Sequence, residues 1–364
     1  MRIAATLGLF LAEVIVLALQ PVPRSAPGLG HVVEEKVSGM SVQIHQERLT
    51  TTFTLRGLPP GVEPRLTVSD GQKDLSNWLL LPERGPGEVS QRLSYMGVEM
   101  YPARRLTYTW QVGGESLSGE YLYVHPNYPF SWEVEQRGPL VFYHSGNLSQ
   151  QVAADWGEAY QWLGAELGME PVERVVYLLP DRNSLQKALG SDPLVSNVAG
   201  LWVGRLQGIL TSTDFSPEAL RLIMTHEFAH AYLENDNPSW WEEGIATWIE
   251  ARYLSRFVLP SLTPEGLRPY EALAERMRAE PVLLVRINQS QASPLDPYTV
   301  GYSFCRYVES QWGDGAVLRL AVAAAARPLK EAVFEVLGQS LDAVEAGWQE
   351  YVRSGDLVED LASD

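Results

Sequence analysis

The segment His226-Glu227-Phe228-Ala229-His230 carries side chains that can bind and use a divalent metal ion. Its two histidines are four residues apart, so on a helix their rings project from one face, one turn from each other. That spacing allows both imidazoles to reach a single zinc ion at about 2.0–2.1 Å. Glu227 stands beside the first histidine and is placed to accept a proton from an activated water without binding the metal itself.

The residues before this segment are typical of a helix start. Ser216 is a favourable N-cap, Pro217 suits the first helical position, and Glu218 complements the helix dipole. The sequence therefore predicts that both histidines lie on one helix. The motif alone is also compatible with an exposed helix that carries two unrelated histidines, so the neighbouring sequence has to decide.

A second helix supplies a candidate for a third ligand. Asn237-Pro238 marks its start, and it runs on through Glu250. Two histidines and one inward glutamate form the donor set of a catalytic zinc site, which leaves a fourth position open for water. Glu242 and Glu243 are both candidates for the glutamate.

The pattern Trp-x-x-Glu-Gly-x-Ala at 240–246, after His-Glu-x-x-His, resembles the gluzincin superfamily of zinc peptidases and especially its peptidase MA-like proteins. The resemblance covers roughly residues 130–352. It implies one zinc ion held by His226, His230 and Glu243, with Glu227 as general base. Glu242 is the rival ligand, and its implied role is outside the first coordination shell or in solvent.

The segment Tyr-Thr-Val-Gly at 298–301 resembles a helix that follows the metal site in this superfamily. The resemblance implies that the tyrosine three residues before the glycine donates a hydrogen bond to the oxyanion. Tyr298 occupies that place, and Tyr302 is the runner-up. Such a donor contributes about 2.7–4 kcal/mol to transition-state stabilisation. The alternative is that Tyr298 is an ordinary half-buried aromatic residue.

The order of strand and helix patterns predicts an α+β protein. Residues 32–129 alternate β-branched runs with Gly/Pro turns, including hairpin-type dipeptides at 70–71 and 113–114, and predict an all-β, sandwich-like domain. Residues 130–354 predict strands at 140–143, 172–179 and 204–211, and helices at 148–167, 183–189, 270–280, 298–311, 316–326, 329–337 and 341–352.

The resemblance makes residues 130–354 a zincin-like catalytic domain, with a small mixed sheet plus helices. It also implies that an extended substrate pairs with an edge strand ahead of the metal-binding helix, and 204–211 is the segment in that position. The acidic tail, 355–364, is expected to be frayed.

The N-terminus predicts export. Arg2 precedes an apolar run from Ile3 to Leu19. Residues 1–20 therefore predict a signal peptide or an uncleaved membrane anchor, followed by a linker at 21–31. The chain is expected outside the cell, or anchored with its catalytic domain outside the cytoplasm.

The composition limits the partners. A net charge of −17, from 45 acidic and 28 basic residues, argues against nucleic acid. The single cysteine, Cys305, excludes an intrachain disulfide and is expected to be a small apolar residue of a helix face. A peptide or protein substrate is the expected partner. Two alternatives are a catalytically inactive zincin-fold scaffold or binding protein at the cell surface, and a metal-free adhesion protein.

Overall fold

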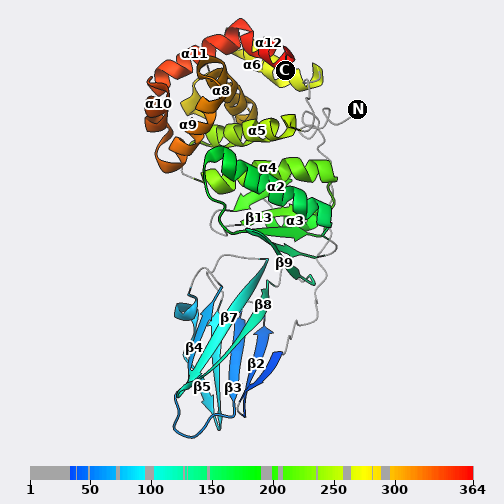
Figure 1. The fold of residues 1–364 in the computed structure, drawn as a ribbon, viewed down its shortest axis with the longest axis vertical. Coiled ribbons are helices and arrows are strands. Elements are labelled where there is room, and N and C mark those ends of the chain that lie inside the picture. The colour runs from blue at the N-terminus through cyan, green and yellow to red at the C-terminus, as the bar shows by residue number, and fades with distance from the viewer. Residues whose placement is uncertain are drawn as a thin grey trace.

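The computed structural model describes residues 33–37, 39–47, 50–70, 74–94, 102–125, 128, 130–145, 148–189, 199–203, 208–234, 237–256, 264–280, 282–287 and 296–363. Figure 1 shows a β-rich part, in blue and cyan, and a part in which helices gather around a further sheet. Within the described ranges, no helix has the length and apolar character needed to cross a membrane. The predicted signal peptide or anchor at 1–20 and the linker at 21–31 lie outside the described residues.

The N-terminal part consists of two antiparallel sheets. One has the order β1 (Val33–Val37), β2 (Met40–Glu47), β3 (Thr50–Arg56), β6 (Glu88–Ser94), β5 (Glu83–Gly85), and the other has the order β4 (Arg65–Ser69), β7 (Ala103–Val112), β8 (Glu115–Val124). A short 3-10 helix, η1 (Ser76–Trp78), lies between β4 and β5. Alternate residues of both sheets, among them Ile44, Phe53, Tyr108 and Trp110, belong to one buried cluster. The two sheets therefore share a core, as the alternating sequence predicts.

The hairpin predicted at Gly113-Gly114 is found. β7 and β8 pair along their length around Gly113 and Gly114, and Gly113 has a φ of 63°, which favours glycine. At the predicted turn Asp70-Gly71 the chain returns antiparallel on itself: Ser69 and Asp74 form a bridge, and the Leu75 N–H donates to the Val68 carbonyl oxygen at 2.8 Å. Residues 71–73 lie outside the described part of the chain. The main strand partner of β4 is the distant β7.

The second part is built on a sheet with the order β12 (Gly200–Val203), β13 (Gly208–Ser212), β11 (Arg174–Leu179), β10 (Leu140–His144), β9 (Glu133–Arg137). The three inner strands are parallel, and both outer strands are antiparallel to their neighbours. Successive side chains point to opposite faces. Phe142 and Val176 join the core beneath the helices, whereas Tyr143 and Tyr177 join a second cluster on the other face, together with Leu185 of α3 (Arg182–Leu189).

The strand predicted at 204–211 is found in part, and its predicted role as an edge strand is wrong. The observed strand β13 begins at Gly208, and residues 204–207 lie outside the described part of the chain. β13 has neighbours on both sides, β11 and β12. The edge strand is β12, because Gly200–Val203 folds back antiparallel on β13 and takes up its free edge.

Helices cover the sheet and extend away from it (Figure 1). They are α2 (Gln150–Leu167), α4 (Pro217–Leu233), α5 (Ser239–Ser255), α6 (Pro264–Ala279), α7 (Leu284–Ile287), α8 (Pro297–Trp312), α9 (Asp314–Ala326), α10 (Leu329–Leu337), α11 (Leu341–Ser354) and α12 (Asp356–Ser363). The predicted helices are found with small shifts at their ends, and α6 begins earlier than predicted. Cys305 is fully buried on α8, as expected of a small apolar residue.

The C-terminal tail is helical, so the prediction of a frayed segment at 355–364 is wrong. Leu357 and Leu361 of α12 are 0% and 1% exposed and lie on one face, four residues apart. The hydroxyl of Tyr351 on α11 also donates a hydrogen bond to Asp360. Burial of the two leucines outweighs the acidity of the segment and holds the last helix against the rest of the molecule.

Candidate metal centre

Helix α4 places the two histidines as predicted. The side chain of Ser216 accepts a hydrogen bond from the Ala219 N–H at 3.2 Å, and Pro217 is the first residue of the helix. His226 and Glu227 are both buried in the middle of α4. His230 follows one turn later, with its ring centroid 4.9 Å from that of His226.

Helix α5 completes a cluster of three donor atoms. His226 Nε2 lies 3.1 Å from Glu243 Oε2 and 3.2 Å from His230 Nε2, and His230 Nε2 lies 3.5 Å from the same carboxylate oxygen. Donor atoms placed 2.0–2.1 Å from a tetrahedral ion are about 3.3–3.4 Å apart. The three observed separations, 3.1, 3.2 and 3.5 Å, are close to this value, so the donors are near enough to share one metal ion.

Glu243, and not Glu242, joins the two histidines. Among the described residues, the group of donors close enough to share one metal ion consists of His226, His230 and Glu243. Glu242 lies one residue earlier on α5, about 100° around the helix, and lines a pocket beside the cluster. This agrees with the choice that the resemblance implies.

The charges around the cluster favour a bound cation. Burial by itself lowers the pKa of His226, but the hydrogen bonds with Glu243 and Glu250 and the charge of Glu227 outweigh it and raise the pKa to about 10. Burial likewise acts to raise the pKa of Glu243, but hydrogen bonds and charge from His226 and His230 lower it well below its usual range. Three carboxylates thus surround two imidazoles, an excess of negative charge that a divalent ion neutralises.

Glu250 is a member of this site that the sequence reasoning missed. Its Oε2 atom lies 3.3 Å from His226 Nδ1, on the side of the ring opposite the cluster. A carboxylate in this position holds the proton on Nδ1 and leaves the Nε2 lone pair for a metal ion. The spacing in the sequence could have pointed to Glu250. It follows Glu243 by seven residues, which places both side chains on the same face of α5, two turns apart.

The edge strand β12 holds Glu227. The Trp202 N–H donates a hydrogen bond to Glu227 Oε2 at 2.6 Å. Gly200 permits this approach, because a Cβ atom there would overlap the side chain of Ile223 and lie 3.1 Å from Glu227 Cγ. Burial raises the pKa of the Glu227 carboxyl, while the charges of His226 and His230 act to lower it. A carboxyl in this environment is suited to take up and release a proton.

Two glycines set the distance between α5 and α8. A Cβ atom on Gly301 would overlap the carbonyl oxygen of Trp240 and lie 2.5 Å from the Cα atom of Gly244. A Cβ atom on Gly244 would lie 2.7 Å from the Gly301 carbonyl oxygen. The two backbones are therefore in direct contact, which only glycine allows at both positions. The crossing fixes Glu243 and Tyr298, one and three residues before these glycines, relative to each other.

Tyr298 lies beside the cluster. Its ring centroid is 5.7 Å from that of His226, and Asp296 caps its helix by accepting from the Thr299 N–H at 3.2 Å. Burial raises the pKa of the phenol, and the charges of Glu243 and Glu227 raise it further, so the group stays a neutral donor. Tyr302 packs against Tyr270 instead, with 5.8 Å between ring centroids. Of the two candidate tyrosines, Tyr298 is the one whose ring contacts a histidine of the cluster.

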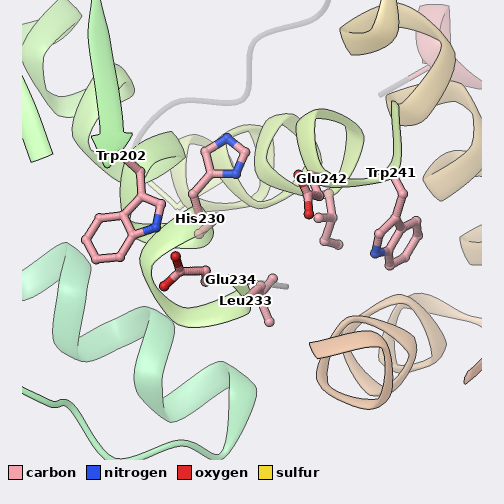
Figure 2. Close-up of a pocket in the computed structure, with 8 residues that line it drawn as sticks. Trp202, His230, Leu233, Glu234, Trp241 and Glu242 are labelled. Atoms are coloured by element: carbon pink, nitrogen blue, oxygen red, sulfur yellow. The ribbon is translucent and has the colours of Figure 1, made fainter. Parts of the chain in front are cut away.

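A pocket of about 190 Å³ adjoins the cluster at His230 (Figure 2). It is formed by α4, the first turns of α5 and the edge strand β12. The residues that line it are Trp202, Ala229, His230, Leu233, Glu234, Trp241, Glu242 and Ile245. Because His230 belongs to both, a group seated in the pocket would lie next to a molecule bound at the cluster.

A scan against protein-family models and a search of curated proteins find no match to this chain. We therefore infer the function from the residues and the geometry of the cluster. The five predicted site residues, His226, Glu227, His230, Glu243 and Tyr298, come from three helices and meet in one place.

Proposed function

We propose that this chain is a zinc-dependent peptidase of the gluzincin type, similar to the peptidase MA-like proteins. The observation that carries the proposal is the close spacing of His226 Nε2, His230 Nε2 and Glu243 Oε2. Glu227 beside this cluster, and Tyr298 at its edge, supply the proton acceptor and the hydrogen-bond donor that peptide hydrolysis needs.

Each residue of the site has a separate role in the proposed reaction. His226, His230 and Glu243 would hold a zinc ion, and the ion would supply Lewis-acid chemistry, acidifying a water and polarising the scissile carbonyl. Glu227 accepts the proton of the attacking water and passes it to the leaving nitrogen, a transfer that its raised pKa favours. Tyr298 donates its phenolic hydrogen to the negative charge that develops on the carbonyl oxygen. The Trp202 N–H keeps the carboxylate of Glu227 in place.

The proposal also covers the domain organisation and the export of the chain. Residues 130–354 form a zincin-like catalytic domain, and residues 32–129 form a β-sandwich-like domain that precedes it. The chain is exported by its first twenty residues, as a secreted protein or with this segment as an anchor. The substrate is a peptide or a protein.

Zinc content and casein hydrolysis test the proposal together. The wild-type protein is expected to hold one zinc ion per chain by elemental analysis and to hydrolyse casein. Glu243→Ala is expected to lose the metal, and Glu242→Ala, the matched control, to keep it. Glu227→Gln is expected to keep the metal and lose hydrolysis by about 10²–10⁴-fold, the usual contribution of a general base.

Two results would count against it. A wild-type protein without zinc, even after the metal is added back, would remove the metal site and leave an adhesion protein. A protein that holds zinc but hydrolyses no unstructured protein would indicate a zincin-fold binding or scaffold protein. The intact Glu227 argues against that alternative, because a scaffold has no need of a general base.

A further inference from the structure

The pocket beside His230 is suited to a single side chain. At about 190 Å³ it is smaller than the roughly 300–1,000 Å³ of pockets that enclose whole small molecules. It is open to solvent on one side, where Glu234 is exposed. Figure 2 shows Trp202 and Trp241 at opposite ends, with His230 and Glu242 between them.

The lining combines apolar walls with negative charge. Trp202, Leu233, Trp241 and Ile245 contribute hydrocarbon and aromatic surface, and Glu234 and Glu242 contribute two carboxylates. No Lys or Arg stands among the described residues that line the pocket. A long aliphatic side chain with a positive end matches both properties, since its stem lies against apolar groups while its charged head reaches a carboxylate. The Trp202 ring already has the guanidinium of Arg174 5.4 Å from its centroid, so the two carboxylates supply the attraction for a substrate cation.

Trp202 connects the pocket with the candidate general base. Its backbone N–H holds the Glu227 carboxylate, and its indole lines the pocket. The indole Nε1 is buried and has no hydrogen-bond partner within the described part of the chain. Trp202 therefore joins the pocket to the general base through a single residue, because its backbone contacts Glu227 while its side chain lines the pocket.

We propose that this pocket binds a lysine or arginine side chain of the substrate, at the residue next to the cleaved bond. The proposal rests on the proposed peptidase function and names its substrate class. Acidic side chains are disfavoured in the pocket by repulsion from Glu234 and Glu242. The net charge of −17 also raises the local concentration of cationic peptides near the protein.

A binding experiment tests the pocket without any turnover. Lysine hydroxamate and norleucine hydroxamate differ by the terminal amine, and both carry a group that binds zinc. The zinc-loaded full chain is titrated with each, and binding is measured as the rise in Tm. The lysine compound is expected to bind about tenfold more tightly. The double variant Glu234→Gln/Glu242→Gln is expected to bind both compounds alike.

The matched control removes the same charge elsewhere. Glu331 and Glu359 are exposed on α10 and α12, and neither is among the residues that line the pocket. The Glu331→Gln/Glu359→Gln variant is expected to keep the tenfold difference. Equal binding of the two hydroxamates to the wild-type protein, or an unchanged difference in the Glu234/Glu242 variant, would overturn the pocket assignment. Zinc content and melting curves of each variant show that it is folded and loaded.

Cleavage-site profiling on a mixture of unlabelled peptides separates this proposal from the function it rests on. Enrichment of Lys and Arg at one position beside the cleaved bonds, lost in the Glu234/Glu242 variant, supports both. Cleavage without such enrichment contradicts the assignment of the pocket to a cationic side chain but is consistent with the peptidase function. If no peptide is cleaved but the hydroxamate difference is present and depends on the two glutamates, the peptidase function fails and the cationic pocket remains.

Discussion

His226 contacts a carboxylate at each of its ring nitrogens, and this double contact determines which nitrogen is available to a metal ion. Nε2 lies near Glu243 and His230, while Nδ1 lies 3.3 Å from Glu250. With its proton held on Nδ1, the ring presents the Nε2 lone pair to the site shared by the three donors. In the proposed metal site, Glu250 would therefore affect how well His226 binds zinc without being a ligand itself.

Replacing Glu250 is expected to weaken zinc binding without removing a ligand. Glu250→Ala frees the His226 ring to rotate and to change its tautomer, so zinc affinity is expected to fall about 10–100-fold. Glu250→Gln keeps an oxygen that accepts from Nδ1 and is expected to recover most of the affinity. Competition with a chelator of known zinc affinity measures both values. An alanine variant that binds zinc as tightly as the wild type would show that Glu250 does not orient His226.

The crossing of α5 and α8 is the element-scale feature on which the site depends. α5 carries Glu243 and Glu250, and α8 carries Tyr298 near its first turn. The helices touch through Gly244 and Gly301, where neither position has room for a Cβ atom. Separating the helices by the width of a methyl group would therefore move Tyr298 away from the cluster.

Gly301→Ala is expected to destabilise the protein and to separate Tyr298 from the cluster. The added methyl group overlaps the Trp240 carbonyl oxygen, and such overpacking costs about 1–3 kcal/mol in free energy of unfolding. Under the proposed function, hydrolysis is expected to fall while zinc content is kept, since all three candidate ligands lie on α4 and α5. Urea unfolding and elemental analysis check the two effects.

Gly157→Ala is the matched control for this substitution. Gly157 lies within α2, and a Cβ atom there meets nothing within 4 Å. The substitution is expected to stabilise the protein by about 0.5–1 kcal/mol, because alanine loses less backbone entropy than glycine in a helix. A Gly301→Ala protein as stable as this control would contradict the tight crossing.

On the scale of the whole molecule, the β-rich part and the central sheet share buried contacts. Ala103 and Val124 of the two longest strands pack in one cluster with Tyr143, Tyr177 and other residues of the central sheet. The Arg105 N–H also donates a hydrogen bond to the Tyr143 hydroxyl at 2.9 Å. These contacts lie on the face of the central sheet opposite α2 and α4, so the β-rich part covers one face while the helices hold the candidate metal centre on the other.

His125 makes this junction sensitive to acid. It is 3% exposed and stands between the rings of Tyr123 and Tyr128, and burial lowers its pKa below the ordinary value. As the pH falls through the ordinary histidine pKa of about 6.5, the unfolded chain takes up a proton that the folded chain does not. The free energy of unfolding therefore decreases from that pH down to the lowered folded-state pKa.

His125→Phe is expected to lose part of this pH dependence. Phenylalanine keeps an aromatic ring between the two tyrosines and cannot take up a proton. Urea unfolding at pH 7.5 and at pH 5.5 compares the two proteins. His45→Gln, at an exposed position of β2, serves as the control and is expected to behave as the wild type. An equal loss of stability in the wild type and His125→Phe would exclude His125 as a source of the acid sensitivity.

Much of the cluster was predictable because it depends on short-range geometry. The four-residue spacing of His226 and His230, the cap at Ser216 and the proline at 217 determine a helix with two rings on one face, whatever surrounds it. Alternation likewise predicts the strands β3, β4, β7 and β8, since burial of every second residue is a property of the strand itself.

Tertiary structure decided what depends on segments that meet through space. β12 became the edge strand because Gly200–Val203 pairs antiparallel with β13. β4 pairs with β7, which is distant in the sequence. The roles of Glu250 and Trp202, the pocket beside His230 and the packing of α12 all require neighbours that the local pattern does not name. The periodicity of apolar residues determines which face of a helix or strand is buried. Which other element packs against that face depends on the packing of the whole chain.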